Sequence, residues 1–387
     1  MIRRMVSRSP RTPLARPASY EIATILPPSE HYTPAAAGAI ALFVHGTTQG
    51  SAYQSHITVF GSYLDKTRRF QGCKYQGVDP SLAMLLGKNK GFTRGLIDAL
   101  RKRPVGLIEV HNRVLNFFQL AKAFPNMPMS IYFHNDPQTI KGAMTPKERW
   151  RILERADAIY CCSDFVRRRF LTGLEAGRND HVHVLYHGIP PITPKARKEP
   201  VILFAGRLIE EKGVLELAQA AQRLLPHFPN WRIAFAGASR PGGKTATPYA
   251  KAVGAALRPL GKQAVFLGHQ PYTKVLDLFS RASIAVVPST WNEPMGRTAA
   301  EALLSGCALV TSGHGGLAEV AGDAGVLVSP VTADGLALAL QGLMEDPATL
   351  RAVQVRCLEH AHHFTQAMTM GQLDQHRYHL LARAYGG

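Results

Sequence analysis

The sequence repeats one rhythm in both halves: a short apolar run, a turn signal and then a helical pattern of apolar residues. The apolar runs span residues 21–27, 56–63, 105–111, 129–135, 158–163 and 182–188 in the first half, and 201–208, 232–237, 264–269, 284–289, 308–312 and 325–330 in the second. Helical patterns fill the gaps, for example at 213–225, 245–258, 273–281 and 297–305. Apolar strands that alternate with helices are typical of a parallel sheet covered on both faces. We therefore predict an α/β fold with two doubly wound domains.

The segment GIPPITPKARKEP, residues 188–200, separates the two halves and is rich in proline and charge, as linkers are. We predict a disordered basic leader at 1–20, a first domain at 21–190, a linker at 191–200, a second domain at 201–365, and a C-terminal helix at 366–387 that could cross back to the first domain. Ligands of doubly wound sheets bind at the carboxyl ends of the strands. The cleft between the domains is therefore the expected site.

The net charge of the 387-residue chain is +18, and the excess of Lys and Arg is larger in residues 1–190 than in residues 191–387. Such a field attracts anions, including acidic lipid headgroups and phosphorylated substrates. No aromatic RNA-binding motif or zinc-ligand spacing accompanies the charge, so we expect no nucleic-acid partner. The five cysteines are scattered and no apolar run could span a bilayer. We expect a cytoplasmic protein whose basic face could dock on the inner face of the plasma membrane.

Two glutamates stand eight positions apart in NEPMGRTAAEALLSG, residues 292–306. One helix would place Glu293 and Glu301 about 80° out of register, and Pro294 disfavours a helix at its own position. The stretch instead predicts a strand, a loop that carries Glu293 into the cleft, and a helix that carries Glu301 and ends at Gly306. The free amides of that helix start can bind phosphate or sugar oxygens, while carboxylates accept hydroxyl protons. This combination suits a nucleotide sugar.

Two further segments fit the same ligand. Arg207 lies at the end of an apolar run and Lys212 just before a helical pattern, so both cations are expected at the carboxyl edge of the sheet, where they could neutralise a diphosphate. The stretch TSGHGGLAEV, residues 311–320, is a glycine-rich turn between a strand and a helix. Within it, we interpret Glu319 as a helix-surface residue.

These motifs resemble the retaining GT-B glycosyltransferases of family 4. The resemblance is carried by GRLIEEKG at 206–213 and by residues 286–320, which include the E-x7-E glutamate pair. It is looser in the first half, at 27–40 and 132–138. The resemblance implies the GT-B fold, in which two Rossmann-like domains face each other across a cleft. The first domain would bind the acceptor and the second the nucleotide sugar.

The resemblance also implies roles for single residues at the donor site. Arg207 and Lys212 would bind the donor diphosphate and stabilise it as the leaving group. Glu293 would contact hydroxyls of the transferred sugar, and Glu301 the ribose. Gln270 would lie against the base.

Other implied roles belong to the reacting centre and its surroundings. Backbone at Met295, Gly296 and Arg297 would contact the donor sugar and its phosphate. His134 would sit by the reacting centre, where it would bond the donor sugar or the acceptor; a purely structural histidine is an equal alternative. Gly38 would line the diphosphate side of the cleft.

The sequence departs from the family pattern at three places, which leaves the donor open. The loop that usually has two adjacent glycines reads Ala37-Gly38-Ala39. Met295 replaces the usual phenylalanine, and Arg297 replaces an apolar residue. Arg297 could reach a phosphate or an acidic sugar, or it could face solvent.

The predicted function is transfer of a hexose from a nucleoside-diphosphate sugar, a UDP-sugar in preference to GDP-mannose, with retention of configuration. The acceptor would be a glycan or a lipid-linked glycan in bacterial surface polysaccharide or lipopolysaccharide synthesis. No covalent nucleophile is evident, so we expect front-face attack assisted by the departing phosphate. No metal is expected, because two cations serve the diphosphate. The alternatives are a GT-B sugar-nucleotide epimerase and a non-catalytic nucleotide-binding protein.

Overall fold

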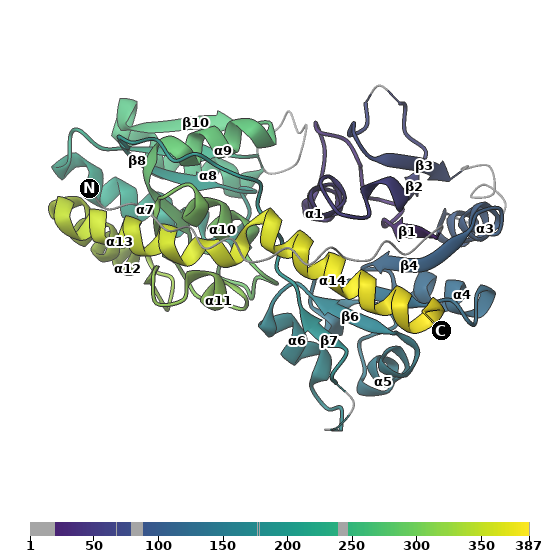
Figure 1. Ribbon diagram of the computed structural model, residues 1–387. Helices are drawn as coiled ribbons and strands as arrows, with labels where there is room; N and C mark the ends of the chain where they lie inside the picture. Colours follow the sequence, from purple (N-terminus) through teal and green to yellow (C-terminus); the bar gives the residue numbers. More distant parts are fainter. Residues whose placement is uncertain are drawn as a thin grey trace, which may run out of the picture.

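The computed structural model describes residues 20–66, 68–78, 88–175, 177, 179–238 and 247–386. Apart from Tyr20, the leader predicted at 1–20 lies outside these residues. Two parallel sheets of seven and six strands, each covered by helices, form two domains (Figure 1). This arrangement confirms the predicted α/β fold with two doubly wound domains.

The first sheet has the strand order β3-β2-β1-β4-β5-β6-β7, and all its neighbouring strands are parallel. Its strands are β1 (Glu21–Ile25), β2 (Ile57–Ser62), β3 (Lys74–Val78), β4 (Val105–His111), β5 (Met129–Phe133), β6 (Ala158–Cys161) and β7 (Val182–Val184). The helices of this domain are α1 (Ala39–Thr48), α3 (Lys88–Leu100), α4 (Val114–Ala123), α5 (Pro146–Arg155) and α6 (Asp164–Leu171). All seven residues of β4 are buried, as expected for a central strand covered on both faces.

The second sheet has the order β10-β9-β8-β11-β12-β13 and is also parallel. Its strands are β8 (Glu199–Ala205), β9 (Arg232–Ala236), β10 (Ala264–Gly268), β11 (Ala282–Val287), β12 (Ala308–Thr311) and β13 (Val326–Leu327). Its helices are α7 (Val214–Leu224), α8 (Pro248–Leu257), α9 (Tyr272–Arg281), α10 (Arg297–Leu304), α11 (Leu317–Ala321), α12 (Ala333–Glu345) and α13 (Pro347–His360).

Strand order reverses between β1 and β4 in the first sheet, and between β8 and β11 in the second. In open parallel sheets, such a reversal leaves a crevice beyond the carboxyl ends of the two strands, and ligands bind there. The loops after β1 and β4 therefore face the first crevice, and the loops after β8 and β11 face the second.

The sequence pattern did not predict β3, the edge strand of the first sheet. Its sequence KYQGV has no continuous apolar run, and its burial is mixed along its length. An edge strand pairs on one side only, so backbone hydrogen bonding can hold it without the apolar signal of a central strand.

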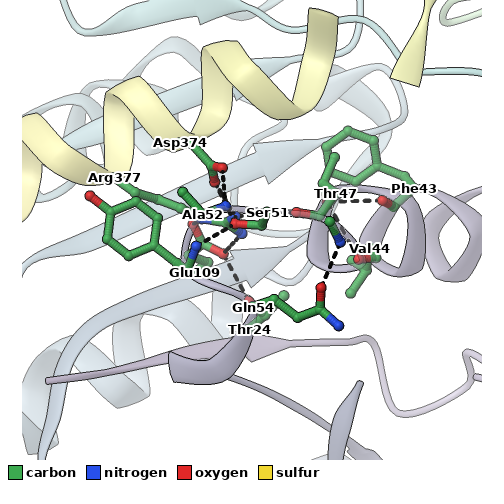
Figure 2. Close-up of polar contacts among 12 residues, drawn as sticks. Thr24, Phe43, Val44, Thr47, Ser51, Ala52, Gln54, Glu109, Asp374 and Arg377 are labelled. Carbon is green, nitrogen blue, oxygen red and sulfur yellow. Dashed lines mark hydrogen bonds and ion pairs between the residues drawn. The ribbon is translucent and has the colours of Figure 1, made fainter. Parts of the chain in front are cut away.

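The last helix, α14 (Gln366–Tyr385), leaves the second domain and packs against α1 and β4 of the first, as the yellow ribbon of Figure 1 shows. Figure 2 shows the buried polar contacts that hold it there. The Arg377 guanidinium donates two hydrogen bonds to Glu109 of β4, at 2.9 and 2.8 Å, and a third to Asp374 at 3.1 Å. Asp374 in turn accepts from the Ser51 hydroxyl at 2.6 Å and from the backbone N–H of Ala52 at 2.8 Å.

No helix in the part of the chain that the structure describes is both long and apolar enough to cross a membrane. We retain as a proposal the division into domains at 21–190 and 201–365, with the linker at 191–200 and the final helical segment at 366–387.

Candidate functional site

A cavity of about 300 Å³ lies between the two domains, at the carboxyl ends of both sheets. The first domain contributes His134, which follows β5, and His187, which follows β7. The second domain contributes Arg207, after β8, and Glu293, after β11. The cavity therefore opens at the strand-order reversal of the second sheet, where the fold predicts a ligand.

Lys212 and Glu293 meet in this cavity. The Lys212 ammonium forms an ion pair with the Glu293 carboxylate, and the side chains are only 19% and 9% exposed. The same carboxylate oxygen accepts a hydrogen bond of 2.6 Å from the Ser289 hydroxyl. The Lys212 ammonium also lies 5.4 Å from the centre of the Trp291 ring, within cation–π range. This pair joins a cation to a carboxylate on the cavity wall.

Arg207 also lines this cavity. Its side chain is exposed and forms no ion pair with any other residue that the structure describes. An unpaired guanidinium at the carboxyl edge of a sheet is free to bind an anion, and its planar fork suits phosphate.

The glycine-rich turn at 313–316 packs against the Glu293 loop, backbone to backbone. Gly316 donates its N–H to the Glu293 carbonyl at 2.7 Å, and Gly315 pairs with Glu293 in an isolated β-bridge. Gly315 has a φ of +65°, and a Cβ there would lie 2.4 Å from the Glu293 carbonyl oxygen. The turn therefore fixes the loop that carries Glu293, and only glycine fits at that position.

Helix α10 begins at the cavity. Gly296 is its N-cap with a φ of +88°, where a Cβ would lie 2.3 Å from the Leu317 side chain. Met295, Gly296 and Arg297 all line the cavity, as the sequence predicts. Met295 is buried, and its sulfur accepts the backbone N–H of His187 at 3.1 Å, a contact between the two domains.

A second cavity of about 260 Å³ adjoins the first, because Ala205, Gly206, Arg207 and Thr298 line both. Gln270 and Glu301, which are expected beside the base and the ribose, both line this second cavity. The Gln270 amide donates to the Leu267 carbonyl. The two cavities thus form one elongated site with two compartments.

Arg297 does not face solvent. Its guanidinium is buried on α10 and forms an ion pair of 2.9 Å with Glu301, one turn further along. It also donates to the Tyr272 hydroxyl at 2.7 Å and, across the domain boundary, to the Gly188 carbonyl at 3.4 Å. Burial raises the pKa of the Glu301 carboxyl, although Arg297 opposes that rise. The second glutamate of the pair is therefore held by a cation of its own helix.

Gly38 is the N-cap of α1, beside the cavity, and its neighbour Ala39 is the residue that lines it. The Glu30 carboxylate accepts from the N–H groups of Gly38 and Ala41, at 3.0 and 3.2 Å. The start of α1 is thus occupied by an internal carboxylate.

His134 is buried and packs against other aromatic groups, although it also lines the cavity. Its two ring nitrogens each lie 2.8 Å from another histidine, His111 on one side and His187 on the other. The Phe43 ring of α1 packs beside all three imidazoles. The sequence singles out His134, but the structure makes it the middle member of a group of three.

Glu319 is a cross-domain contact rather than the surface residue that the sequence suggests. Its carboxylate accepts hydrogen bonds from the backbone N–H groups of Asp164 and Phe165, at 2.6 and 2.5 Å, at the start of α6 in the first domain. The Tyr186 hydroxyl donates to it at 3.2 Å. Since α6 contributes a positive dipole end, the charge of Glu319 is well matched to its partners. Local sequence offers no signal for a contact across 154 positions.

Replacing Glu319 with alanine should weaken the contact between the two domains by about 1–2 kcal/mol, the usual scale for losing a helix cap. We expect a lower melting temperature together with a larger radius of gyration in small-angle scattering, because α6 loses its anchor on the second domain. Glu359→Ala, an exposed glutamate of the same domain, is the matched control. An unchanged radius of gyration with a lowered melting temperature would show that Glu319 stabilises without holding the domains together.

Sequence comparison identifies two family models in the chain. The model described as Glycosyltransferase Family 4 matches residues 53–191, and the model described as Glycosyl transferases group 1 matches residues 189–364. Among curated relatives, YtcC of Bacillus subtilis is 27% identical over 305 aligned positions, in an alignment that covers 73% of this chain and 72% of YtcC. The lipopolysaccharide 1,2-N-acetylglucosaminetransferase of Salmonella typhimurium is 26% identical, in an alignment that covers 62% of this chain and 64% of that protein.

Solved structures share the fold at low sequence identity. Sucrose-phosphate synthase from Thermosynechococcus elongatus superposes with a TM-score of 0.77 at 22% identity, over 94% of this chain and 100% of the other. Alr3699/HepE from Anabaena, solved in complex with UDP-glucose, superposes with a TM-score of 0.71 at 17% identity, over 92% of this chain and 99% of the other. The two family models adjoin at the linker and together span residues 53 to 364. The chain belongs to the family 4 glycosyltransferases, which have the GT-B fold.

Proposed function

We propose that this chain transfers a hexose, with retention of configuration, from a nucleoside-diphosphate sugar to a glycan or lipid-linked acceptor. One observation carries the proposal. Arg207 lines both of the adjoining cavities, Lys212 and Glu293 line the larger one, and Glu301 lines the smaller one. This order of groups suits a sugar, a diphosphate and a nucleoside lying along one elongated site.

In the proposed reaction, cleavage of the bond between the sugar and the diphosphate builds negative charge on the leaving phosphate. Arg207 and Lys212 are the cations that would stabilise this charge, and Lys212 is already held in place by Glu293 before the reaction. Glu293 would accept hydrogen bonds from hydroxyls of the transferred hexose. We propose front-face attack, in which the departing phosphate takes the proton of the acceptor hydroxyl. Two cations then serve the leaving group without a metal ion.

We propose a UDP-sugar as the donor, with GDP-mannose as the second choice. HepE, which shares the fold, was solved with UDP-glucose, and this supports the first choice. For Glu301 to bind the ribose, one carboxylate oxygen must remain available while Arg297 holds the other. Arg297 would therefore orient the carboxylate toward the nucleoside and would not itself bind the phosphate.

We place the acceptor in bacterial surface polysaccharide or lipopolysaccharide synthesis, and the protein in the cytoplasm or peripherally on the inner face of the plasma membrane. Residues 1–190, which contain the domain that would bind the acceptor, carry +13 of the net charge of +18, from 26 Lys and Arg against 13 Asp and Glu. Cations near an anionic surface each contribute about 1 kcal/mol to membrane binding. The name of the Salmonella relative assigns it to lipopolysaccharide, which supports this choice.

The donor can be identified by thermal shift with UDP-, GDP-, ADP- and dTDP-sugars, with and without EDTA. A ligand at 100 times its Kd stabilises the native state by about 2.7 kcal/mol. We expect a shift with the UDP-sugar that EDTA leaves unchanged. Glu301→Ala should abolish it, measured against the variant's own unliganded melting temperature, since removal of Glu301 also leaves Arg297 without its partner.

Each other outcome has a distinct meaning. A shift that EDTA removes would contradict metal-free chemistry. A shift without transfer to any glycan, but with interconversion of the free nucleotide sugar, would favour the epimerase. No shift with any of the four sugars would contradict the proposed function and favour a binding protein.

A further inference from the structure

Lys212 and Glu293 are paired with each other in the larger cavity, although the proposed function gives them different parts of the donor, the diphosphate and the hexose. A donor that binds to both must draw the Lys212 ammonium toward its phosphate and leave the Glu293 carboxylate to its sugar. Each group therefore needs a second partner that holds it in place once the ion pair is loosened.

Glu293 has such partners close to its own loop. Its carboxylate also accepts the hydrogen bond of 2.6 Å from the Ser289 hydroxyl, and its backbone carbonyl accepts the Gly316 N–H at 2.7 Å. Neither contact involves Lys212. The carboxylate can therefore keep its position when the ammonium turns to another anion.

The second partner of Lys212 is the indole ring of Trp291, whose centre lies 5.4 Å from the ammonium. Trp291 follows β11, two residues before Glu293, and it lines the larger cavity. Its side chain is 40% exposed, so burial in the core does not account for a tryptophan at this position.

Lys212 and Trp291 come from two segments that pack backbone to backbone. The N–H of Thr290 donates to the Glu211 carbonyl at 3.0 Å. Gly213, which follows Lys212, has a φ of +61°, and a Cβ there would collide with the carbonyl of the residue that follows β11. The distance between ring and ammonium is therefore set by the backbone and does not depend on a ligand.

The ring can hold the ammonium without competing for its hydrogen bonds. A cation is attracted to the face of an aromatic ring by the ring quadrupole, most strongly in tryptophan. An ammonium carries three N–H donors, and the Glu293 carboxylate accepts from one of them. A phosphate oxygen can therefore take the place of the carboxylate while the ammonium stays beside the ring.

We propose that Trp291 is a positioning residue, which holds Lys212 at the donor diphosphate when the donor separates Lys212 from Glu293. This inference rests on the proposed function, since it assumes a nucleoside diphosphate in the cavity. Trp291 acts through Lys212, so its replacement should affect only the ligands and steps in which Lys212 takes part.

The test compares Trp291→Leu and Trp291→Phe with wild type by calorimetric titration with UDP and UMP, and with GDP and GMP. The monophosphates keep the nucleoside and lack the second phosphate, on which the leaving charge builds. Leucine removes the ring and, because Trp291 is 40% exposed, leaves no enclosed hole. Phenylalanine keeps a ring that attracts cations less strongly than indole does.

We expect Trp291→Leu to bind the preferred diphosphate, UDP in our proposal, about 5-fold more weakly, which corresponds to roughly 1 kcal/mol. Its affinity for the matching monophosphate should stay within about 2-fold of wild type. Trp291→Phe should lie between wild type and Trp291→Leu. The kcat for release of the nucleoside diphosphate should fall in the same order.

A double-mutant cycle separates positioning from packing. In a Lys212→Ala protein, Trp291→Leu should have no further effect on the affinity for the diphosphate, whereas in an Arg207→Ala protein its 5-fold effect should persist. Trp231→Phe is the matched control, because Trp231 is a partly buried tryptophan of the same domain that lines neither of the two adjoining cavities. It should leave both affinities unchanged.

Equal losses for the diphosphate and the monophosphate in Trp291→Leu would overturn the inference, as would an unchanged affinity for the diphosphate or an effect that persists in Lys212→Ala. In each of these cases, a wild-type protein that prefers the diphosphate leaves the proposed function standing. A wild-type protein that binds neither UDP nor GDP would overturn the proposed function and the inference together.

Discussion

Replacing Lys212 with alanine is expected to lower kcat by about 100- to 1,000-fold, the usual effect of removing one preorganised group that stabilises developing negative charge. Lys212 is the less exposed of the two cations at the site and is fixed by Glu293 and Trp291 before any ligand binds. Arg207→Ala should have a similar effect. If both side chains stabilise the same leaving phosphate, the loss in the double variant will be smaller than the product of the two single losses.

The measurement is steady-state release of the nucleoside diphosphate from the donor that the thermal-shift panel identifies. Lys274→Ala is the matched control, because Lys274 is an exposed lysine of α9 whose ion pair is with Asp277, three positions along the same helix. Circular dichroism and the melting temperature establish that each variant is folded. A folded Arg207→Ala/Lys212→Ala protein with wild-type turnover would contradict the role of these cations.

The positions of Arg207 and Glu293 could be predicted from the sequence because each lies within one local unit of strand, loop and helix. The strands β8 and β11 are apolar runs, and parallel strands bring their carboxyl ends to one edge. Two residues from separate segments therefore converge without any knowledge of side-chain contacts. The same logic places Gln270, after β10, at the edge of the smaller cavity.

Contacts between the domains could not be predicted in this way. Glu319 bonds to the start of α6, and Arg297 reaches Gly188, over separations of more than a hundred residues. Nothing in the local pattern around either residue distinguishes an interdomain contact from a solvent-exposed helix face. The contacts among His111, His134 and His187 could not be predicted for the same reason: each lies at or shortly after a strand end, but only the packing of the three segments shows which nitrogens are paired.

The placement of helix α14 could not be predicted from the sequence either. Its helical character is readable from the sequence, but its placement depends on Arg377, whose partner Glu109 lies 268 positions away. A charged residue within a helical pattern is ordinarily solvated. Only the buried carboxylates of β4 and α14 explain why this arginine faces inward.

Replacing Arg377 with methionine should destabilise the protein by about 3–5 kcal/mol, the scale found when one partner of a buried ion pair is removed. Arg377 is 1% exposed, and Glu109 and Asp374 are each 6% exposed, so both carboxylates would be left in the core without their cation (Figure 2). The outcome can be measured as a shift in the urea midpoint of the transition that reports on the first domain. Arg383→Met, an exposed arginine of the same helix, should change that midpoint little.

The pH dependence of this loss tests its cause. Burial alone would raise the pKa of Glu109, but the Arg377 guanidinium and the Thr24 hydroxyl bring it below its ordinary value. A carboxyl whose pKa is lowered on folding stabilises the native state above its unfolded pKa, and this contribution disappears as the pH falls through the folded pKa. The gap between wild type and Arg377→Met should therefore narrow on acidification, and Arg377→Met/Glu109→Gln should recover part of the loss at neutral pH. A gap that is independent of pH would instead assign the effect to lost packing of the arginine side chain.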